Sequence, residues 1–335
     1  MNTPEIVSKD AHFAIGSVVT TPDGRIRNPA VLYVLTMNTD QSRNKVAQLL
    51  NLIAREFGYH SLAECPWSEL TAELVLSLKT RWEMQKKAPA TINFALTVLR
   101  GVIKQAWLDE QISDRTYRRI CAIKPARGSR EPHGRALSNI ETYKLLEDCE
   151  TDGSLIGRRG AAIFAVGIGG GLRRTEICTL AFENLLPDEG RISIVGKGNK
   201  QRSIYLGPEV WKRLNAWLVA RRQARTVSEK MQAAPLSESG YVFCSVLKGG
   251  NLHPEKPLTA NGIYIIMRRH AEKLGLESFS PHDLRRTYAT RLFQMGGQIQ
   301  VVSRAMGHAS IITTQRYDKS GDEEVKRLSS NLPLF

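Results

Sequence analysis

The chain has 335 residues, of which 42% are hydrophobic and 24% charged, as in a soluble globular protein with room for two domains. Lys and Arg outnumber Asp and Glu by 47 to 33, so we expect a polyanionic partner; a basic surface that serves only solubility is the alternative. No apolar run approaches the ~20 residues that span a bilayer, and the first residues lack the layout of a signal peptide, which predicts a cytoplasmic protein without a membrane partner.

Residues 1–30 carry little hydrophobic pattern, and we expect them to be flexible. Residues 31–123 show apolar side chains at helical spacing, which predicts an all-α domain with four helices. Their outer faces carry cations, so the domain is either a surface for the polyanion or an ordinary helical bundle with a solvated exterior. The predicted helices start near Thr39, Thr71, Pro89 and Asp114.

The segment 124–137 interrupts this pattern with two prolines, two glycines and four cations, a composition typical of an interdomain linker. Its arginines, Arg127 and Arg130 among them, are suited to contact a phosphate backbone. Ser138 and Glu141 then form a capping-box pattern that predicts the start of a second domain, residues 138–335.

The second domain is predicted to be mainly α with a small β-sheet. The sequence favours a β-hairpin from the strands 191–195 and 201–206 around a glycine-bearing turn, and a further short strand at 241–245. Helices are expected over 158–168 and 208–225, after Thr259, and after Ser280, where a cap residue precedes proline. A tail, residues 318–335, closes the chain.

The stretch 280–317 is rich in Arg and His and poor in carboxylates, which suits it to an anion, most simply a phosphate. His282 and Arg285 are three residues apart at a helix start, where free N–H groups also favour an anion. His282 with Asp283 resembles a metal-binding dipeptide, but the neighbouring arginines would repel a divalent cation, so we expect no metal.

Two segments further upstream add cations that suit the same anion. Arg173 follows a glycine turn, and Glu176 is placed to pair with it; a purely structural ion pair is the alternative. Lys197 lies in the predicted hairpin turn, where it is suited to contact a phosphate or donate a proton, although a solvated lysine is the ordinary expectation. Lys200 and Arg202 are expected to add backbone contacts.

Two aromatic side chains end the stretch. His308 follows Gly307 at a predicted helix end, and Tyr317 comes nine residues later. A lone tyrosine near a C-terminus is usually a packing residue, and a neutral phenol is a weak nucleophile. Surrounding cations and a bound phosphate would favour the phenolate, as nucleophilic catalysis requires.

Four motifs, read together, resemble the tyrosine recombinase, or phage integrase, family. They are GLRRTEI (171–177), GKGNKQR (196–202), HDLRRTYAT (282–290) and MGHASIITTQRY (306–317), in the order of that family. Met306 stands where leucine is usual, and Arg174 is bulkier than the residue often found there. The helical first domain is similar to the core-binding domain of the family, so the resemblance implies a core-binding domain joined to a catalytic domain.

The resemblance also implies residue roles. Arg173 and Arg285 would clamp the scissile phosphate, with Glu176 supporting Arg173; Lys197 would be the general acid. His282 would handle the proton of the nucleophile, His308 would orient the phosphate, and Tyr317 would attack it. No cofactor is implied. The expected DNA contacts are Arg100, Lys104, Arg118, Arg119, Arg127, Arg130, Lys200, Arg202 and Arg286.

By the same resemblance, the partner is double-stranded DNA with a specific recombination site, bound by a homotetramer or heterotetramer at the nucleoid. The reaction would pass through a Holliday junction and serve integration and excision of a mobile element, or resolution of cointegrates or dimers. Two alternatives keep the fold: an idle DNA-binding accessory protein, and a type IB topoisomerase that relaxes one duplex. The tail resembles the one that recombinases of the family pass to a neighbouring subunit, which a monomeric topoisomerase does not need. Packing of the tail in cis is the other possibility.

Overall fold

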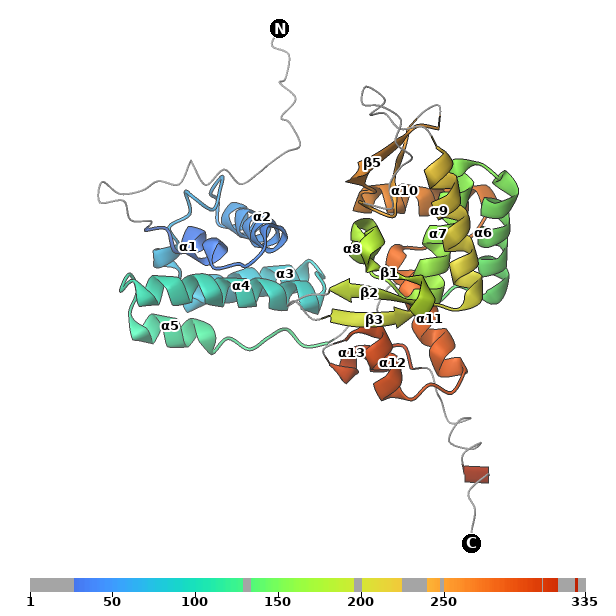
Figure 1. Ribbon diagram of the computed structural model, residues 1–335. Coiled ribbons are helices and arrows are strands. Elements are labelled where there is room, and N and C mark those ends of the chain that lie inside the picture. The colour runs from blue at the N-terminus through green and yellow to red at the C-terminus, as the bar shows by residue number, and fades with distance from the viewer. Residues whose placement is uncertain are drawn as a thin grey trace. The chain divides into compact units, whose positions relative to one another are not determined.

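A computed structural model describes residues 27–128, 134–195, 201–224, 240–247, 250–308, 310–318 and 329–330. The chain divides between residues 132 and 133 into two compact units, each with its own apolar core (Figure 1). Helices dominate both units, and small antiparallel sheets occur in the second. The predicted fold class, mainly α with a small β component, is therefore confirmed.

In the described residues of the first unit the regular elements are all helices, and α4 lies at its centre. The other helices all contact α4, whose apolar face carries Ile92, Leu96, Leu99 and Ile103 into the core. The helices are α1 (Pro29–Leu35), α2 (Asp40–Glu56), α3 (Ala72–Met84), α4 (Pro89–Leu108) and α5 (Asp114–Cys121).

Local capping explains where the helices of the first unit begin. The hydroxyls of Thr39, Thr71 and Ser113 each accept a hydrogen bond from the backbone N–H three residues on. Each such cap contributes about 1 kcal/mol to helix stability. Asn28 caps α1 in the same way, so a helix begins at Pro29, inside the segment that the sequence predicts to be flexible. Residues 1–26 lie outside the described part of the chain.

The second unit is assembled around α7. This helix is contacted by α6, α9 and α11, and 12 of its 16 residues are buried. Its elements are α6 (Asn139–Asp152), α7 (Leu155–Gly170), α8 (Arg174–Thr179), β1 (Leu185–Leu186), β2 (Arg191–Val195), β3 (Gln201–Tyr205), α9 (Pro208–Gln223), β4 (Cys244–Val246), β5 (Leu252–Pro257), α10 (Ala260–Leu274), α11 (Pro281–Gln294), α12 (Ile299–Met306) and α13 (Ile311–Gln315).

Small residues let α7 and α11 approach closely. A Cβ on Gly167 would lie 2.7 Å from Cδ1 of Leu284, nearer than two carbon atoms can stand. Leu284 is 1% exposed, and it adjoins Arg285 on α11. The packing of Leu284 against α7 therefore sets the position of the helix that carries His282 and Arg285.

The predicted hairpin is present as β2 and β3, which pair antiparallel with Ile192 opposite Ile204. Strand β1 adds to its outer edge, and β4 pairs with β5 in a separate sheet. The strand expected at 241–245 begins only at Cys244, while Tyr241 makes an isolated bridge to Ala181. The hairpin turn, residues 196–200, lies outside the described residues. No helix in the described ranges is long and apolar enough to cross a membrane.

Candidate active site

The first turn of α11 presents His282 to the hydroxyl of Tyr317. The Nε2 atom of His282 lies 3.0 Å from the Tyr317 hydroxyl oxygen, within hydrogen-bonding distance. The Tyr317 residue is 5% exposed, and its ring packs with Ala289, Val302 and Met306. The ring is thus held by apolar contacts while its hydroxyl meets a base.

His308 also lies beside the Tyr317 ring. The centroids of the two rings are 6.0 Å apart and their planes differ by 22°. The Nδ1 atom of His308 is 2.9 Å from Oγ1 of Thr314. Gly307, immediately before it, ends α12 with a φ of 60°, a left-handed conformation that favours glycine. A tight turn therefore brings His308 and Tyr317 to one place.

The two histidines are held neutral by their surroundings. Burial lowers the pKa of His308 to about 4, and the positive charges of Arg285 and Arg173 act in the same direction. Loss of water around its ring also lowers the pKa of His282, with further contributions from Arg286 and Arg285. At neutral pH both rings can accept a proton, which a base beside a phenol requires.

Two guanidinium groups converge on the backbone of the same turn. Arg285, which is 2% exposed, donates to the carbonyl oxygens of Gly171 and Met306. Arg173 donates to the carbonyl of Gly307 at 2.7 Å and pairs with Glu176 at 2.8 Å. Burial lowers the pKa of Arg285 to about 10, so it stays a cation at neutral pH. Of the residues that the sequence singled out, Arg173, Arg285, His282, His308 and Tyr317 therefore lie together in one cluster.

Glu176 organises the cationic side of this cluster. The Arg173 backbone N–H donates to Oε2 of Glu176 at 2.7 Å, and both terminal nitrogens of Arg202 lie 2.7 Å from the carboxylate oxygens. Burial alone would raise the pKa of this carboxyl. The hydrogen bonds and positive charges of Arg202 and Arg173 outweigh burial and lower the pKa to about 2. A fixed anion thus holds Arg173 in place.

Arg202 and Arg286 were both expected to contact DNA. The Arg202 side chain is 12% exposed and has both terminal nitrogens on Glu176, a geometry that favours a positioning role. Arg286 lies with its guanidinium carbon 5.5 Å from the centroid of the Tyr317 ring and its Nε atom 3.7 Å from Asp283. Arg286 is therefore part of the site itself.

The remaining predicted DNA contacts lie in the first unit or outside the described residues. Lys104 and Arg127 are exposed. Arg118 pairs with Asp114 at 2.7 Å, Arg119 pairs with Glu73, and Arg100 donates to the Ile123 carbonyl. Three predicted site residues lie in segments that are not described: Arg130, Lys197 and Lys200.

Sequence reasoning missed the backbone acceptors and the second guanidinium on Glu176. The carbonyls of Gly307 and Met306 accept hydrogen bonds from Arg173 and Arg285, and no side-chain pattern reveals such a contact. Arg202 lies two residues before the buried Ile204 on β3, so strand alternation identified its side chain as lying on the same, inward face. Thr314, the partner of His308, carried no signal of its own.

The cluster combines two arginines, two neutral histidines and a phenol, a set suited to hold a phosphate and to deprotonate the phenol beside it. Within the described residues, no group of three or more His, Cys, Asp or Glu side chains is placed to hold a metal ion. The chemistry that this arrangement supports is an attack by Tyr317 on a bound phosphate.

Comparisons with known proteins agree with this chemistry. Residues 135–324, more than half of the chain, match the model of the phage integrase family. The tyrosine recombinase XerD of Listeria monocytogenes is 30% identical over 232 residues, which cover 69% of this chain and 72% of that protein. The tyrosine recombinase XerC of Alcanivorax borkumensis is 28% identical over 257 residues, which cover 76% and 77%.

Solved structures show the same fold at lower identity. The integrase of the Tn1549 transposon, solved with a circular intermediate DNA, aligns with a TM-score of 0.65 at 16% identity and covers 91% of this chain and 99% of that one. The site-specific recombinase XerH, bound to a palindromic difH substrate, aligns with a TM-score of 0.61 at 20% identity and covers 92% and 81%. The chain therefore belongs to the phage integrase family and is a tyrosine site-specific recombinase.

Proposed function

We propose that this recombinase cuts and rejoins double-stranded DNA at a specific site through a covalent intermediate on Tyr317. The observation that carries the proposal is the 3.0 Å contact between the Tyr317 hydroxyl and Nε2 of His282, inside a ring of cations. The excess of 14 positive charges supports a polyanionic substrate. Two of the similar structures, a transposon integrase with a circular intermediate DNA and a site-specific recombinase bound to its difH substrate, support the same substrate here.

The proposed reaction uses Tyr317, His282 and Lys197. The Tyr317 oxygen forms a bond to phosphorus while His282 accepts the phenol proton. The bond from phosphorus to the 5′ oxygen breaks, and Lys197, which lies outside the described residues, gives that oxygen a proton. The products are a 3′-phosphotyrosyl link and a free 5′ hydroxyl.

Arg173, Arg285 and His308 would stabilise and orient the phosphate during the reaction. Arg173 and Arg285 would contact the non-bridging oxygens, where negative charge grows in the transition state. For this they would exchange their carbonyl partners at Met306 and Gly307 for phosphate oxygens, a stronger, charge-assisted contact. His308, beside the Tyr317 ring, would orient the phosphate.

Strand exchange reverses the same step. A 5′ hydroxyl from a partner duplex attacks the phosphotyrosine, rejoins the DNA and releases Tyr317, and two such exchanges pass through a Holliday junction. Each step exchanges one phosphate ester bond for another, so the reaction needs no cofactor as an energy source. The named relatives are recombinases, which supports exchange between duplexes over an idle accessory role or relaxation of one duplex.

We further propose that the first unit is the core-binding domain, and that the chain acts at the nucleoid in the cytoplasm as a homotetramer or heterotetramer. Exposed cations such as Lys104 and Arg127 support DNA contact by the first unit. The role would be integration and excision of a mobile element, or resolution of cointegrates or dimers.

A covalent-trapping assay tests the proposal. Duplexes selected from a random-sequence library by their binding to the protein are resynthesised with a nick at successive positions, so that cleavage next to the nick releases a short fragment. We expect a protein–DNA complex that survives SDS for one nick position. Binding without any covalent complex, across all nick positions, would contradict a cutting and rejoining enzyme and favour an accessory protein.

A further inference from the structure

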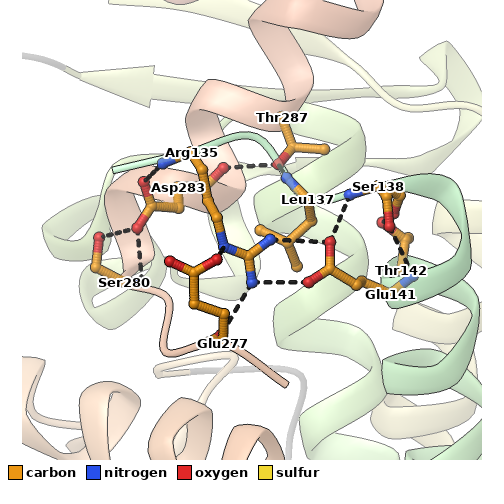
Figure 2. Close-up of polar contacts among 9 residues, drawn as sticks. All are labelled: Arg135, Leu137, Ser138, Glu141, Thr142, Glu277, Ser280, Asp283 and Thr287. Carbon is orange, nitrogen blue, oxygen red and sulfur yellow. Dashed lines mark hydrogen bonds and ion pairs between the residues drawn. The ribbon is translucent and has the colours of Figure 1, made fainter. Parts of the chain in front are cut away.

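The segment Gly134–Leu137 runs across the first two turns of α11, as Figure 2 shows for Arg135 and Leu137. At Gly134 the φ is +124°, and a Cβ would lie 2.4 Å from Oδ1 of Asp283 and 3.4 Å from Nη2 of Arg286. Both the conformation and the space require glycine. The backbone of the segment is thus pressed against the Asp283 carboxylate.

Hydrogen bonds join the segment to two successive turns of α11. The Arg135 backbone N–H donates to Oδ1 of Asp283 at 3.0 Å, and the Leu137 N–H donates to Oγ1 of Thr287 at 2.8 Å. The Thr287 hydroxyl in turn donates to the Asp283 carbonyl at 2.7 Å. Asp283 and Thr287 are four residues apart and lie on one face of the helix. The segment is therefore attached along α11 rather than at a single point.

The Arg135 side chain ties this arrangement to two further places. Its Nη1 and Nη2 atoms lie 2.9 and 2.7 Å from the two carboxylate oxygens of Glu141, the capping-box residue of α6. Its Nε atom lies 3.0 Å from Oε2 of Glu277, and Nη2 donates to the Glu277 carbonyl at 2.9 Å (Figure 2). One guanidinium thus links the start of α6 to the chain just before α11.

Asp283 belongs both to this network and to the active-site helix. It is 5% exposed, and its Oδ2 atom accepts from the backbone N–H and the hydroxyl of Ser280 at 2.8 and 2.7 Å. Its neighbour His282 contacts the Tyr317 hydroxyl. The Nε atom of Arg286 lies 3.7 Å from Oδ1 of Asp283, and the guanidinium of Arg286 lies over the Tyr317 ring. The first two turns of α11 therefore carry both the bonds to the segment and the groups that surround the nucleophile.

We propose that Arg135 and Asp283 are positioning residues, which fix the segment 134–137 to the first turn of α11 and thereby hold His282 and Arg286 against Tyr317. The inference rests on the proposed function.

The test separates positioning from folding. Covalent-complex formation is followed in a single turnover at saturating protein, on the nicked duplex that traps wild type. Arg135→Ala should lower the rate constant for formation of the covalent complex at least tenfold. The protein concentration that gives half-saturation should change less than twofold, and the final yield of complex should be unchanged. A residue needed only for folding would lower the yield and leave the rate constant of the folded molecules as it is.

Two further variants sharpen the result. Arg135→Lys keeps one charge but cannot span Glu141 and Glu277 together, so its rate constant should lie between those of wild type and Arg135→Ala. Arg213 of α9 is the matched control, since its side chain is 19% exposed against 25% for Arg135 and it also pairs with two glutamates, Glu150 and Glu209. Arg213→Ala should cleave at the wild-type rate.

Asp283→Asn tests the other half of the network, because an amide cannot accept from Arg135 and Ser280 through both of its polar atoms. It should slow cleavage as Arg135→Ala does. Suppose that wild type forms the covalent complex and that both the Arg135→Ala and Asp283→Asn variants form it at the wild-type rate, with or without a lower yield. The positioning inference is then overturned, while the proposed function stands. If wild type itself is never trapped, the proposed function fails first.

Discussion

At the scale of single residues, Glu176 is the anion on which the cationic site depends. It accepts from Arg173 and from both terminal nitrogens of Arg202, and it is 7% exposed. Removing its charge would leave Arg173 and Arg202 without their carboxylate partner, and breaking a buried ion pair costs roughly 3–5 kcal/mol. Glu176→Gln should therefore destabilise the protein by about 3 kcal/mol at pH 7, measured by urea denaturation.

The stabilisation contributed by Glu176 should decrease as the pH falls. The pKa of Glu176 in the folded protein, about 2, is below its ordinary value of 4.5, so its contribution is present above pH 4.5 and lost as the pH falls toward 2. The difference in stability between wild type and Glu176→Gln should shrink over that range. A difference that stays constant between pH 5 and pH 3 would contradict the charge as its cause.

His308 gives a second pH effect, at higher pH. Its pKa of about 4 in the folded protein lies below the ordinary 6.5, so the unfolded chain binds more protons between these values. The contribution of neutral His308 is complete above pH 6.5 and is lost as the pH falls toward 4. We expect the thermal midpoint of wild type, compared with His308→Gln, to fall more steeply between pH 7 and pH 4.5. Parallel curves would refute this.

At the scale of elements, the turn between α12 and α13 positions both His308 and Tyr317. Gly307 has a φ of 60°, and a Cβ there would lie 2.6 Å from Cδ of Arg202. Gly275, which ends α10 with a φ of 62°, has no atom within 4 Å of such a Cβ and is a matched control. Both Gly→Ala changes should cost about 1 kcal/mol in backbone strain.

The two variants should differ in activity. Gly307→Ala should also displace Arg202 and the turn, and slow formation of the covalent complex at least tenfold, whereas Gly275→Ala should leave the rate unchanged. Equal rates for both variants, in the same single-turnover assay, would show that the close approach of Gly307 to Arg202 does not position the site.

Elements and local pairs were the part that the sequence predicted well. The Ser138 capping box, the hairpin of β2 and β3, and the pair of Arg173 with Glu176 all depend on residues close in the chain, and all are present. The contacts that a linear pattern could not predict join distant residues. Arg202 lies 26 positions from Glu176, and Arg135 lies 148 positions from Asp283, so their partners are decided by how α8, β3 and α11 pack.

The same limit applies to the segment 124–137. Composition marks residues 124–137 as a linker, because prolines, glycines and cations interrupt the helical pattern. In the structure, Ala126 packs in the core of the first unit, while Leu137 packs in the core of the second and Arg135 bonds to Asp283. Residues of linker composition can thus be part of a folded unit, and only their tertiary partners reveal it.

At the scale of the whole molecule, the charge of +14 should make DNA binding depend steeply on salt. Each phosphate contact contributes about 0.9 to the slope of log K against log salt concentration. If exposed Lys104 contacts a phosphate, Lys104→Ala should reduce the slope by about 1 on any sequence. Lys212, an exposed lysine of α9, is the control, and equal slopes for the two variants would remove Lys104 from the DNA contacts.

The central claim is that Tyr317 forms the bond to DNA, and the residue in the covalent complex tests it most directly. The trapped complex is digested with trypsin and nuclease, and the peptide that carries the nucleotide is identified by mass spectrometry. We expect a 3′-phosphate on Tyr317 and no complex from Tyr317→Phe. A nucleotide attached to any other residue, or a covalent complex from Tyr317→Phe, would contradict the account.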